Sequence, residues 1–357
     1  MIVAGSSQNA AKICMSRVVS FLCHRPLPIA AICADNTFRV WDVHSSSVLL
    51  EMTLDVDLDE ATGILLSASG HTLAIGYANG NLKVLQSTHT DLARHDWHVG
   101  DNEVSFLAFN GLQSNRLAAC SKQGPLHIVD IVAGVVLQSI SIRFDSEISL
   151  LSMSPWGTVA IGSDAEICIF DTEVGDYVDA WRCKRTGLYA DTTPITCLSF
   201  TPETGDTLAV VDNEVIQLYH WFKEQGEAPE WICTQRVELE FDGHGVFHEL
   251  TWLPTECSFV VVMVDFPSPY HVGVFDIATS IWQFDTVDTE GDFKVAVTAG
   301  HIAIAESHDA SMCSIGLWEV HNGTCIRKQT QSIPSKASAY PRSMAFLGSA
   351  LEHQCHE

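Results

Sequence analysis

The sequence predicts an all-β protein made of seven similar units of four antiparallel strands. The clearest unit contains Ala34–Val43, where turn-forming Asp and Asn precede T-F-R-V-W-D, the alternation expected of a half-buried strand. This stretch ends in a Trp-Asp pair, Trp41-Asp42. Later dipeptides hold equivalent places in strand-like segments: Leu85-Gln86, Val129-Asp130, Phe170-Asp171, Tyr219-His220, Phe275-Asp276 and Trp318-Glu319.

The spacing of these dipeptides is the strongest signal in the chain. Their first residues are separated by 44, 44, 41, 49, 56 and 43 positions. A WD40 unit has about 40 to 45 residues, so four intervals match it and two carry insertions. The chain therefore resembles the WD40-repeat family in degenerate form over nearly its whole length. The resemblance implies a seven-bladed WD40-type β-propeller with four antiparallel strands per blade.

Turn signals separate the strands of each unit. Asn79-Gly80 suits a tight turn in the second unit, S-P-W-G at 154–157 begins a hairpin in the fourth, and T-P-E-T-G-D at 201–206 does so in the fifth. An insertion at 222–231 separates the third and fourth strands of the fifth unit. The units are expected at about 18–52, 63–88, 104–142, 148–181, 195–239, 246–284 and 293–329.

The two chain ends do not fit a simple repeat. We expect a weakly patterned segment at 1–15, the propeller at 16–332 with Val18–Leu22 as its first strand, and a C-terminal segment at 333–357. Within that last segment, Tyr340–Leu347 reads like one more first strand. This strand either takes part in ring closure or begins a further blade of a longer repeat protein.

Composition restricts the partners and the compartment. The chain has 44 acidic and 19 basic residues and a formal net charge of −25, which disfavours nucleic acid and anionic membranes and favours protein or peptide partners of basic character. Its 12 cysteines include no C-x-x-C pair, and several lie in strand-like positions, so we expect reduced structural thiols. The beginning of the chain does not look secretory, and the apolar run Phe259–Val264 is too short to span a membrane. We expect the protein in the cytoplasm, with the nucleus as the alternative.

The resemblance also implies structural roles for individual residues. In WD40 repeats, a turn Asp, a Gly-His histidine, a strand-two Ser or Thr and the Trp of the Trp-Asp pair form a hydrogen-bonded network that braces a blade. Structural positions of this type fall on the following residues: Asp35, Trp41, Asp42, Asp164, Asp171, His244, Asp276 and Trp318.

Neither a metal site nor a catalytic site is predicted. The histidine pairs His95/His98, His244/His248 and His353/His356 lack the further nearby ligands that zinc requires, and they read as polar loop residues. The sequence has no sialidase-type aspartate box, kelch glycine pair, nucleophile elbow or phosphate loop. The acidic run at 55–60 falls between units and suits a solvated loop. We therefore predict a non-enzyme without cofactors.

Three loops between the fourth and sixth units combine basic and aromatic residues, the types enriched at binding hot spots. Family topology places these loops on one face. The bland interpretation is that the basic residues neutralise neighbouring acids and that Phe247 begins a core strand. The candidate partner-binding residues are Arg182, Lys184, Arg185, Tyr189, Phe241, Phe266, Tyr270 and His271.

These observations favour a non-catalytic WD40 scaffold that binds proteins or peptides within a multiprotein assembly. One alternative is the repeat or sensor section of a larger regulatory protein of the NACHT-linked type, which the extra strand at Tyr340–Leu347 favours. The other is a propeller hydrolase, which would require acids converging on the central channel.

Overall fold

The structure is a computed structural model of the chain. It describes residues 28–33, 36–42, 47–54, 60–67, 71–87, 92–111, 114–142, 147–163, 166–172, 176–182, 195–212, 215–222, 230–238, 245–253, 258–265, 270–277, 281–287, 293–298, 301–309, 312–321, 324–334 and 341–346.

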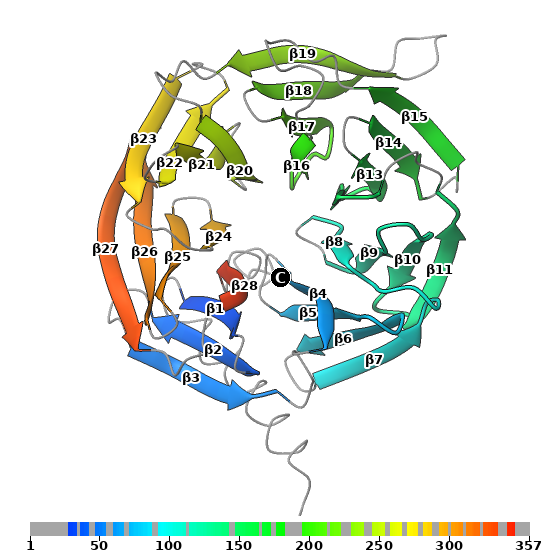
Figure 1. Ribbon diagram of the computed structural model, residues 1–357, viewed down its shortest axis with the longest axis horizontal. Helices are drawn as coiled ribbons and strands as arrows, with labels where there is room; N and C mark the ends of the chain where they lie inside the picture. The colour runs from blue at the N-terminus through cyan, green and yellow to red at the C-terminus, as the bar shows by residue number, and fades with distance from the viewer. Residues whose placement is uncertain are drawn as a thin grey trace, which may run out of the picture.

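The described strands form seven four-stranded sheets, and every pairing within them is antiparallel. Figure 1 shows these sheets arranged side by side around a central axis. We number the sheets 1 to 7 in the order in which their second strands occur along the chain. All-β architecture in antiparallel four-stranded sheets is therefore confirmed.

The strands of the first four sheets have the following bounds. Sheet 1 contains β28 (Pro341–Phe346), β1 (Pro28–Cys33), β2 (Thr37–Asp42) and β3 (Ser47–Thr53). Sheet 2 contains β4 (Ala61–Leu66), β5 (Thr72–Tyr77), β6 (Asn81–Ser87) and β7 (Leu92–His98). Sheet 3 contains β8 (Phe106–Phe109), β9 (Arg116–Cys120), β10 (Leu126–Asp130) and β11 (Val135–Ile140). Sheet 4 contains β12 (Leu150–Met153), β13 (Thr158–Ser163), β14 (Glu166–Asp171) and β15 (Asp176–Arg182).

The remaining sheets continue the order. Sheet 5 contains β16 (Ile195–Phe200), β17 (Thr207–Asp212), β18 (Val215–Phe222) and β19 (Glu230–Glu238). Sheet 6 contains β20 (Gly245–Trp252), β21 (Ser258–Asp265), β22 (Tyr270–Asp276) and β23 (Ile281–Val287). Sheet 7 contains β24 (Phe293–Thr298), β25 (His301–Asp309), β26 (Met312–His321) and β27 (Thr324–Pro334).

Sheet 1 joins the two ends of the described chain. Strand β28 pairs with β1 in the register Ile29↔Phe346, Ala30↔Ala345 and Ala31↔Met344, so it fills the inner edge of the sheet. The expectation that Val18–Leu22 supplies this first strand is therefore wrong, because β28 holds the place; the segment itself lies outside the described residues. The extra strand is paired, so it no longer favours the NACHT-linked alternative.

The inner strands of neighbouring sheets lie against one another. Contacts join β4 to β8, β8 to β12, β12 to β16, β16 to β20, β20 to β24, β24 to β28 and β28 to β4. In Figure 1 the same strands surround the central axis, and strands such as β3, β7, β11 and β19 lie at the periphery. Each sheet thus packs on two neighbours, which explains why one repeat alone would leave its apolar faces exposed.

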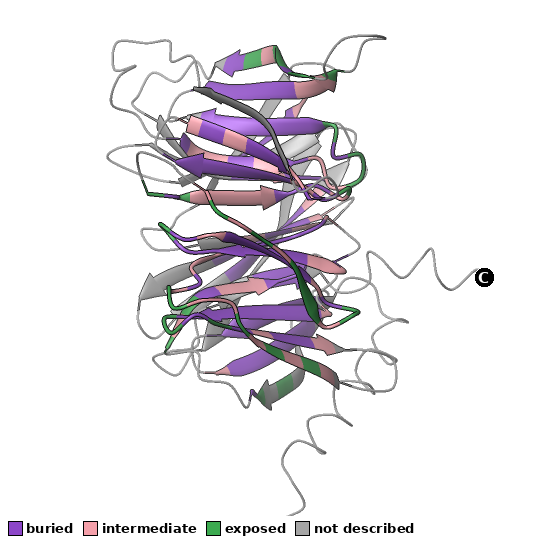
Figure 2. Cartoon of the chain, turned by 90° about the vertical axis from the view of Figure 1, so that its right-hand side faces the viewer, coloured by how far each residue is buried: buried purple, intermediate pink, exposed green. Residues whose placement is uncertain are grey.

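The core consists of apolar layers between adjacent sheets rather than one central cluster. Between sheets 2 and 3, for example, Leu82 and Val84 pack with Leu117, Ala119 and other residues that are 0 % exposed. Figure 2 shows buried residues running through the middle of the stacked strands. Full burial of one such Leu or Val side chain contributes roughly 1.5–3 kcal/mol.

The dipeptides found by spacing hold one common position. In every sheet, the second residue of the dipeptide pairs with the first residue of the second strand. These pairs are Asp42↔Pro28, Gln86↔Thr72, Asp130↔Arg116, Asp171↔Thr158, His220↔Thr207, Asp276↔Ser258 and Glu319↔His301. The first residues of the dipeptides are all buried. The equivalence predicted from sequence is confirmed, although most copies have lost the Trp or the Asp.

Strand β2 differs from the half-buried strand that its alternation suggests. All residues from Thr37 to Trp41 are buried, Arg39 among them at 8 % exposure. Phe38 and Val40 pack toward sheet 2, whereas Trp41 packs with Ala303 and other residues of sheet 7. A strand covered on both faces needs no polar face. The alternating side chains of β2 therefore face two different neighbouring sheets, and neither set faces solvent.

The fourth strand of sheet 2 shows a second correction. His95 and His98 were expected in a polar loop, but both belong to β7. The ring of His95 stacks on that of Trp97 with centroids 5.4 Å apart. The His-Asp-Trp-His run is therefore an outer strand with alternating exposure, a pattern obscured by its polar composition.

Candidate functional site

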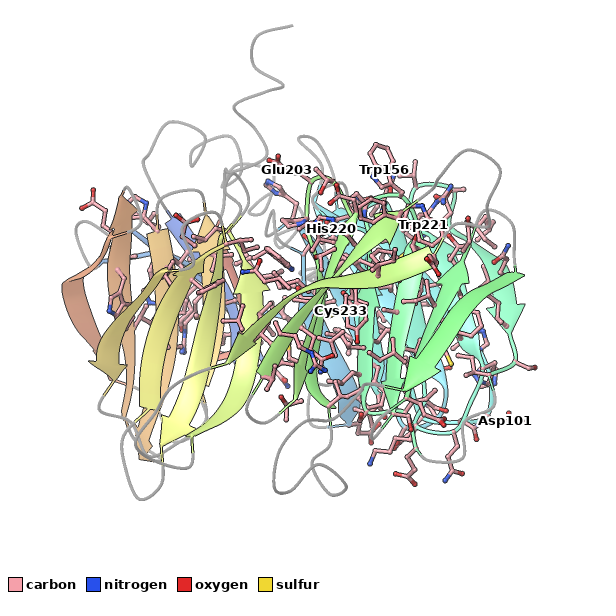
Figure 3. The ribbon with its side chains drawn as sticks, turned by 90° about the horizontal axis from the view of Figure 1, so that it is seen from above. Asp101, Trp156, Glu203, His220, Trp221 and Cys233 are labelled. Carbon is pink, nitrogen blue, oxygen red and sulfur yellow. The ribbon has the colours of Figure 1, made fainter. Side chains whose placement is uncertain are left out.

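The strand directions define two ends of each sheet. The first and third connections of a sheet, such as β12–β13 and β14–β15, lie at one end, which we call the turn face. The second connection and the linker to the next sheet lie at the other end, which we call the linker face. Figure 3 shows Trp156 and Glu203 at the turn face and Asp101, in the linker before β8, at the opposite end.

The first hairpin of sheet 4 is a tight turn over residues 154–157. Gly157 donates its backbone N–H to the carbonyl of Ser154 at 3.1 Å, and Ser154 Oγ accepts the backbone N–H of Thr158 at 2.9 Å. Gly157 has φ of +90°, a conformation that residues with a Cβ rarely adopt. The turn therefore places Trp156 at its tip on a well-bonded backbone.

Trp156 is both exposed and anchored. Its side chain is 65 % exposed, yet the indole N–H donates to the backbone carbonyl of Thr204 in sheet 5 at 2.6 Å. Two other tryptophans make similar bonds between sheets, Trp97 to the carbonyl of Gly134 and Trp252 to that of Ser199, but neither is exposed. Trp156 thus uses its polar edge for structure and leaves its aromatic face to solvent.

The first hairpins of sheets 3, 4 and 5 pack together around this ring. A Cβ placed on Gly111 would lie 2.7 Å from the carbonyl oxygen of Pro202 and 2.9 Å from Cγ of Pro155. A Cβ placed on Gly205 would lie 2.8 Å from Cδ of Pro155. A residue with a Cβ at position 111 or 205 would therefore collide with the neighbouring hairpin. We call the resulting patch the Trp156 surface; its members are Gly111, Pro155, Trp156, Pro202, Glu203 and Thr204.

Acidic side chains lie within and beside the Trp156 surface. Glu203 is exposed, and Asp206 Oδ1 accepts hydrogen bonds from the hydroxyls of Thr204 and Thr207, the latter at 3.2 Å. Within the described part of the chain, neither carboxylate has an ion-pair partner. Arg116 is the nearby cation, since its Nη1 lies 3.2 Å from a Cβ placed on Gly157.

Two acidic residues lie at strand ends on the same face as Arg116. Asp130 is its cross-strand neighbour, and Asp171 lies at the end of β14, beside the residue that bonds Gly157. Four carboxylates thus accompany one guanidinium in this region. The turn face around Trp156 has a negative balance, as does the whole chain.

A concave feature lies on the channel side of sheets 2, 3 and 4. A cavity of about 240 Å³ is lined by the inner strands and the residues just before them: Ile64, Leu65, Ser105, Phe106, Leu107, Ser149, Leu150 and Leu151. The two serines precede β8 and β12, so the cavity lies toward the linker face. Its lining supplies hydroxyl groups and apolar side chains but no acid, base or thiol.

Among the described residues, two buried titratable groups have perturbed pKa values, and neither lines the channel cavity. Burial raises the pKa of the Cys120 thiol to about 12. Burial also lowers the pKa of His127, whose Nδ1 lies 2.9 Å from Ser139 Oγ across the β10–β11 pair. Both shifts are the ordinary result of desolvation, and neither produces a nucleophile or a base facing solvent.

The predicted structural residues divide into three groups. Trp41 and Trp318 are 2 % and 0 % exposed, and Asp171 and Asp276 are half-buried beside the strand-two residues described above. Asp42 ends β2, with its backbone described and its side chain not. Asp35, Asp164 and His244 lie outside the described residues. The indole N–H of Trp41 has no hydrogen-bond partner among the described atoms, so the bracing network stays a prediction.

The predicted partner-binding loops lie at the linker face as far as their strand ends show. Arg182 ends β15, and the β21–β22 connection lies at the same end of its sheet; Tyr270 and His271 begin β22 rather than belonging to a loop. The side chains of these three residues are not described, and Lys184, Arg185, Tyr189, Phe241 and Phe266 lie outside the described residues. Their proximity stays a prediction.

The described residues contain neither a metal-ligand cluster nor a membrane-spanning helix. Across the described ranges, His, Cys, Asp and Glu side chains do not gather in threes as a metal site would require. Nor does that part of the chain contain a helix with the length and hydropathy needed to cross a bilayer. Five cysteines have described side chains, and none of these five is in a disulfide: Cys33, Cys120, Cys168, Cys197 and Cys233.

The sequence analysis identified residues 154–157 only as a turn and missed the exposed tryptophan. The signal was present, because residue 156 is a Trp within a predicted hairpin turn. A large aromatic residue at a solvent-facing turn position indicates either an undetected contact or a binding role. The Thr204 bond explains only one edge of the ring.

Comparison with known proteins supports the fold. No protein-family model matches the chain, and no curated protein matches its sequence. A structure of the mitotic checkpoint complex contains a similar chain, with a TM-score of 0.60, 15% identity and coverage of 82% of this chain and 84% of that one.

Two further solved structures are similar. The Cps50 (Swd1) β-propeller domain of Myceliophteria thermophila has a TM-score of 0.54 at 13% identity and covers 77% of this chain and 87% of its own. A protein from Lactobacillus plantarum has a TM-score of 0.61 at 13% identity, with 90% and 99% covered. At such identities the likeness shows the fold alone: the chain folds as a β-propeller of antiparallel four-stranded sheets.

Proposed function

We propose that the chain is a closed, seven-bladed propeller of the WD40 type that acts as a non-catalytic scaffold for protein or peptide partners. Seven four-stranded sheets, inner-strand contacts from each sheet to the next, and the β28–β1 pairing support the closed ring. The common register of the seven dipeptides supports the WD40 type. The mitotic checkpoint complex, a multiprotein assembly by its name, supplies one structural neighbour.

Trp156 is the observation that favours partner binding. An exposed tryptophan fixed by its N–H loses little side-chain entropy when a partner covers it. Tryptophan is among the residues most enriched at interface hot spots, which cluster on well-packed surfaces. The packed hairpins beneath it, with Pro155 and Pro202, supply a surface that needs no rearrangement before binding.

The lining of the channel cavity gives no support to a hydrolase site at that place. Hydrolysis in a propeller would require a carboxylate, a base or an activated nucleophile at the concave site. The cavity next to β4, β8 and β12 presents Leu, Ile, Phe and Ser instead. Its 240 Å³ is also smaller than the roughly 300–1,000 Å³ of ordinary small-molecule sites.

The three linker-face loops remain the second candidate surface. Their basic and aromatic residues suit a partner different from one that docks at the acidic Trp156 surface. A scaffold with two unlike faces would join two partners. We place this activity in the cytoplasm, with the nucleus as the alternative, on the basis of composition and of the five described cysteines, none of which is in a disulfide.

Affinity capture from a cell extract with identification by mass spectrometry tests the function. The parent is compared with Trp156→Ala and with the triple variant Lys184→Glu, Arg185→Glu, Tyr270→Ala, each verified to melt like the parent. We expect a partner that is lost with Trp156→Ala and retained with the triple variant. Partners lost only with the triple variant would move docking to the linker face, and identical captures with all three proteins would remove both surfaces.

A further inference from the structure

We propose, building on the proposed scaffold function, that the Trp156 surface binds a positively charged peptide segment. A Lys or Arg side chain of the partner lies over the exposed indole face, with its cationic group directed toward Glu203 and Asp206. The partner class is thus a protein with an exposed basic stretch.

The aromatic geometry favours a cation. Tryptophan has the strongest attraction for Lys and Arg among the aromatic residues, and the cation must approach the ring face rather than its edge. The N–H edge of Trp156 is occupied by the Thr204 carbonyl, so the indole can offer a partner its faces and its remaining edges but not that donor. An acceptor group of a partner therefore finds no indole N–H here.

The carboxylates provide the second part of the site. Glu203 directly precedes Thr204, the residue that holds the indole, and Figure 3 places its side chain at the same end of the sheets as Trp156. The threonine hydroxyls fix the orientation of the Asp206 carboxylate without neutralising it. A guanidinium or ammonium group on the ring would gain charge-assisted contacts that neither element offers alone.

An exposed apolar patch on sheet 3 lacks the acids found at the Trp156 surface. Val132, Val135, Val136 and Leu137 are 38 to 73 % exposed at the outer edge of sheet 3. No charged residue occurs between 131 and 142. That strand offers nothing to a cation, whereas the Trp156 surface combines an aromatic face with two uncompensated carboxylates.

A phage-displayed library of random twelve-residue peptides tests the inference. Peptides are selected on the immobilised parent and counter-selected on Trp156→Ala. We expect the survivors to be enriched in Lys and Arg, and a synthetic survivor to lose affinity by about tenfold or more with Glu203→Lys. The same affinity should fall when NaCl is raised from 50 to 300 mM. Glu230→Lys, the same charge change at an exposed acid on β19, is the matched control and should have little effect.

The outcomes separate the inference from the scaffold function. Survivors without basic enrichment, or with equal affinity for the Glu203→Lys and Glu230→Lys proteins, would overturn the cationic partner while leaving Trp156 as a docking residue. A library that yields no peptide distinguishing the parent from Trp156→Ala would overturn the Trp156 surface itself. The scaffold function would then depend on the linker-face loops, which the capture experiment tests separately.

Discussion

Sheet 1 and sheet 4 each have four antiparallel strands, but those of sheet 1 come from both ends of the described chain. Sheet 4 is continuous, and its strands follow one another between Leu150 and Arg182. In sheet 1, the pair Ile29↔Phe346 joins residues 317 positions apart, whereas Leu151↔Ile161 in sheet 4 joins residues 10 apart. By chain-entropy scaling alone, the longer closure costs about 3 kcal/mol more if the intervening chain is unstructured.

The difference shows which sheet depends most on the rest of the fold. A continuous sheet can form its hairpins locally, but β28 reaches β1 only after the other sheets have brought the chain ends together. Met344 and Ala345 of β28 are then buried between sheets 7 and 2. Changes in sheet 1 should therefore affect the stability of the whole molecule, whereas changes in sheet 4 should affect local turn geometry and the binding surface.

The largest effect is expected from removing β28. A chain ending at residue 340 exposes the inner edge of β1 and the flanking faces of sheets 7 and 2, so it should lose the single cooperative melting transition in calorimetry. A chain ending at Ser349 keeps β28 and should melt like the parent. Equal melting of the two shortened chains would show that closure by β28 contributes nothing.

A local defect in sheet 4 should be smaller. Gly157→Ala forces a Cβ onto φ of +90° and to 2.6 Å from Oγ1 of Thr172, so we expect a loss of about 1–3 kcal/mol in unfolding free energy, measured with denaturant. Gly100→Ala is the control, because a Cβ there meets nothing within 4 Å. Indistinguishable midpoints for the two variants would contradict the strained turn.

A tryptophan pair sharpens the comparison between sheet 1 and a continuous sheet. Trp41 in sheet 1 and Trp252 in sheet 6 are 2 % and 3 % exposed. The indole N–H of Trp252 donates to the Ser199 carbonyl at 2.9 Å, whereas that of Trp41 has no partner among the described atoms. Trp252→Phe should therefore destabilise by about 1 kcal/mol more than Trp41→Phe in urea unfolding. The reverse order would mean that the indole of Trp41 has a partner beyond the described residues.

The smallest effect concerns pH and the continuous sheet 3. Burial lowers the pKa of His127 below its usual value of about 6.5, so the unfolded chain takes up a proton that the folded chain resists. Stability should fall as the pH is lowered from about 7 through 6.5 toward the folded pKa. His127→Gln should flatten this slope in melts at pH 7, 6 and 5; an unchanged slope would assign it to other groups.

Much of the fold could be predicted because the repeat has a physical cause. Each unit needs a buried residue in its third strand, opposite the start of its second strand. Trp41, Phe170 and Trp318 fill that place at nearly regular intervals. The period survives even where the Trp-Asp pair is lost, since Leu85 and Val129 satisfy the same burial. Composition hid β7, because an outer strand can be polar without ceasing to be a strand.

The candidate site was less predictable. The sequence alone does not show that the turns at 111, 155 and 202 meet, because they belong to different units about 45 residues apart. Nor does it show that the N–H of Trp156 reaches Thr204, which leaves an anchored ring with an exposed face. The predicted loop residues around Arg182 and Tyr270 share an end of the sheets by strand direction only.

The sequence by itself determined the strand class, the repeat period and the acidic surface, because these depend on local patterns of apolar, turn-forming and charged residues. Only the tertiary structure decided that β28 completes sheet 1, that β2 is covered on both sides, and that the indole of Trp156 bonds Thr204. Each of these depends on which sheets become neighbours, and neighbours are set by packing between segments far apart in the chain.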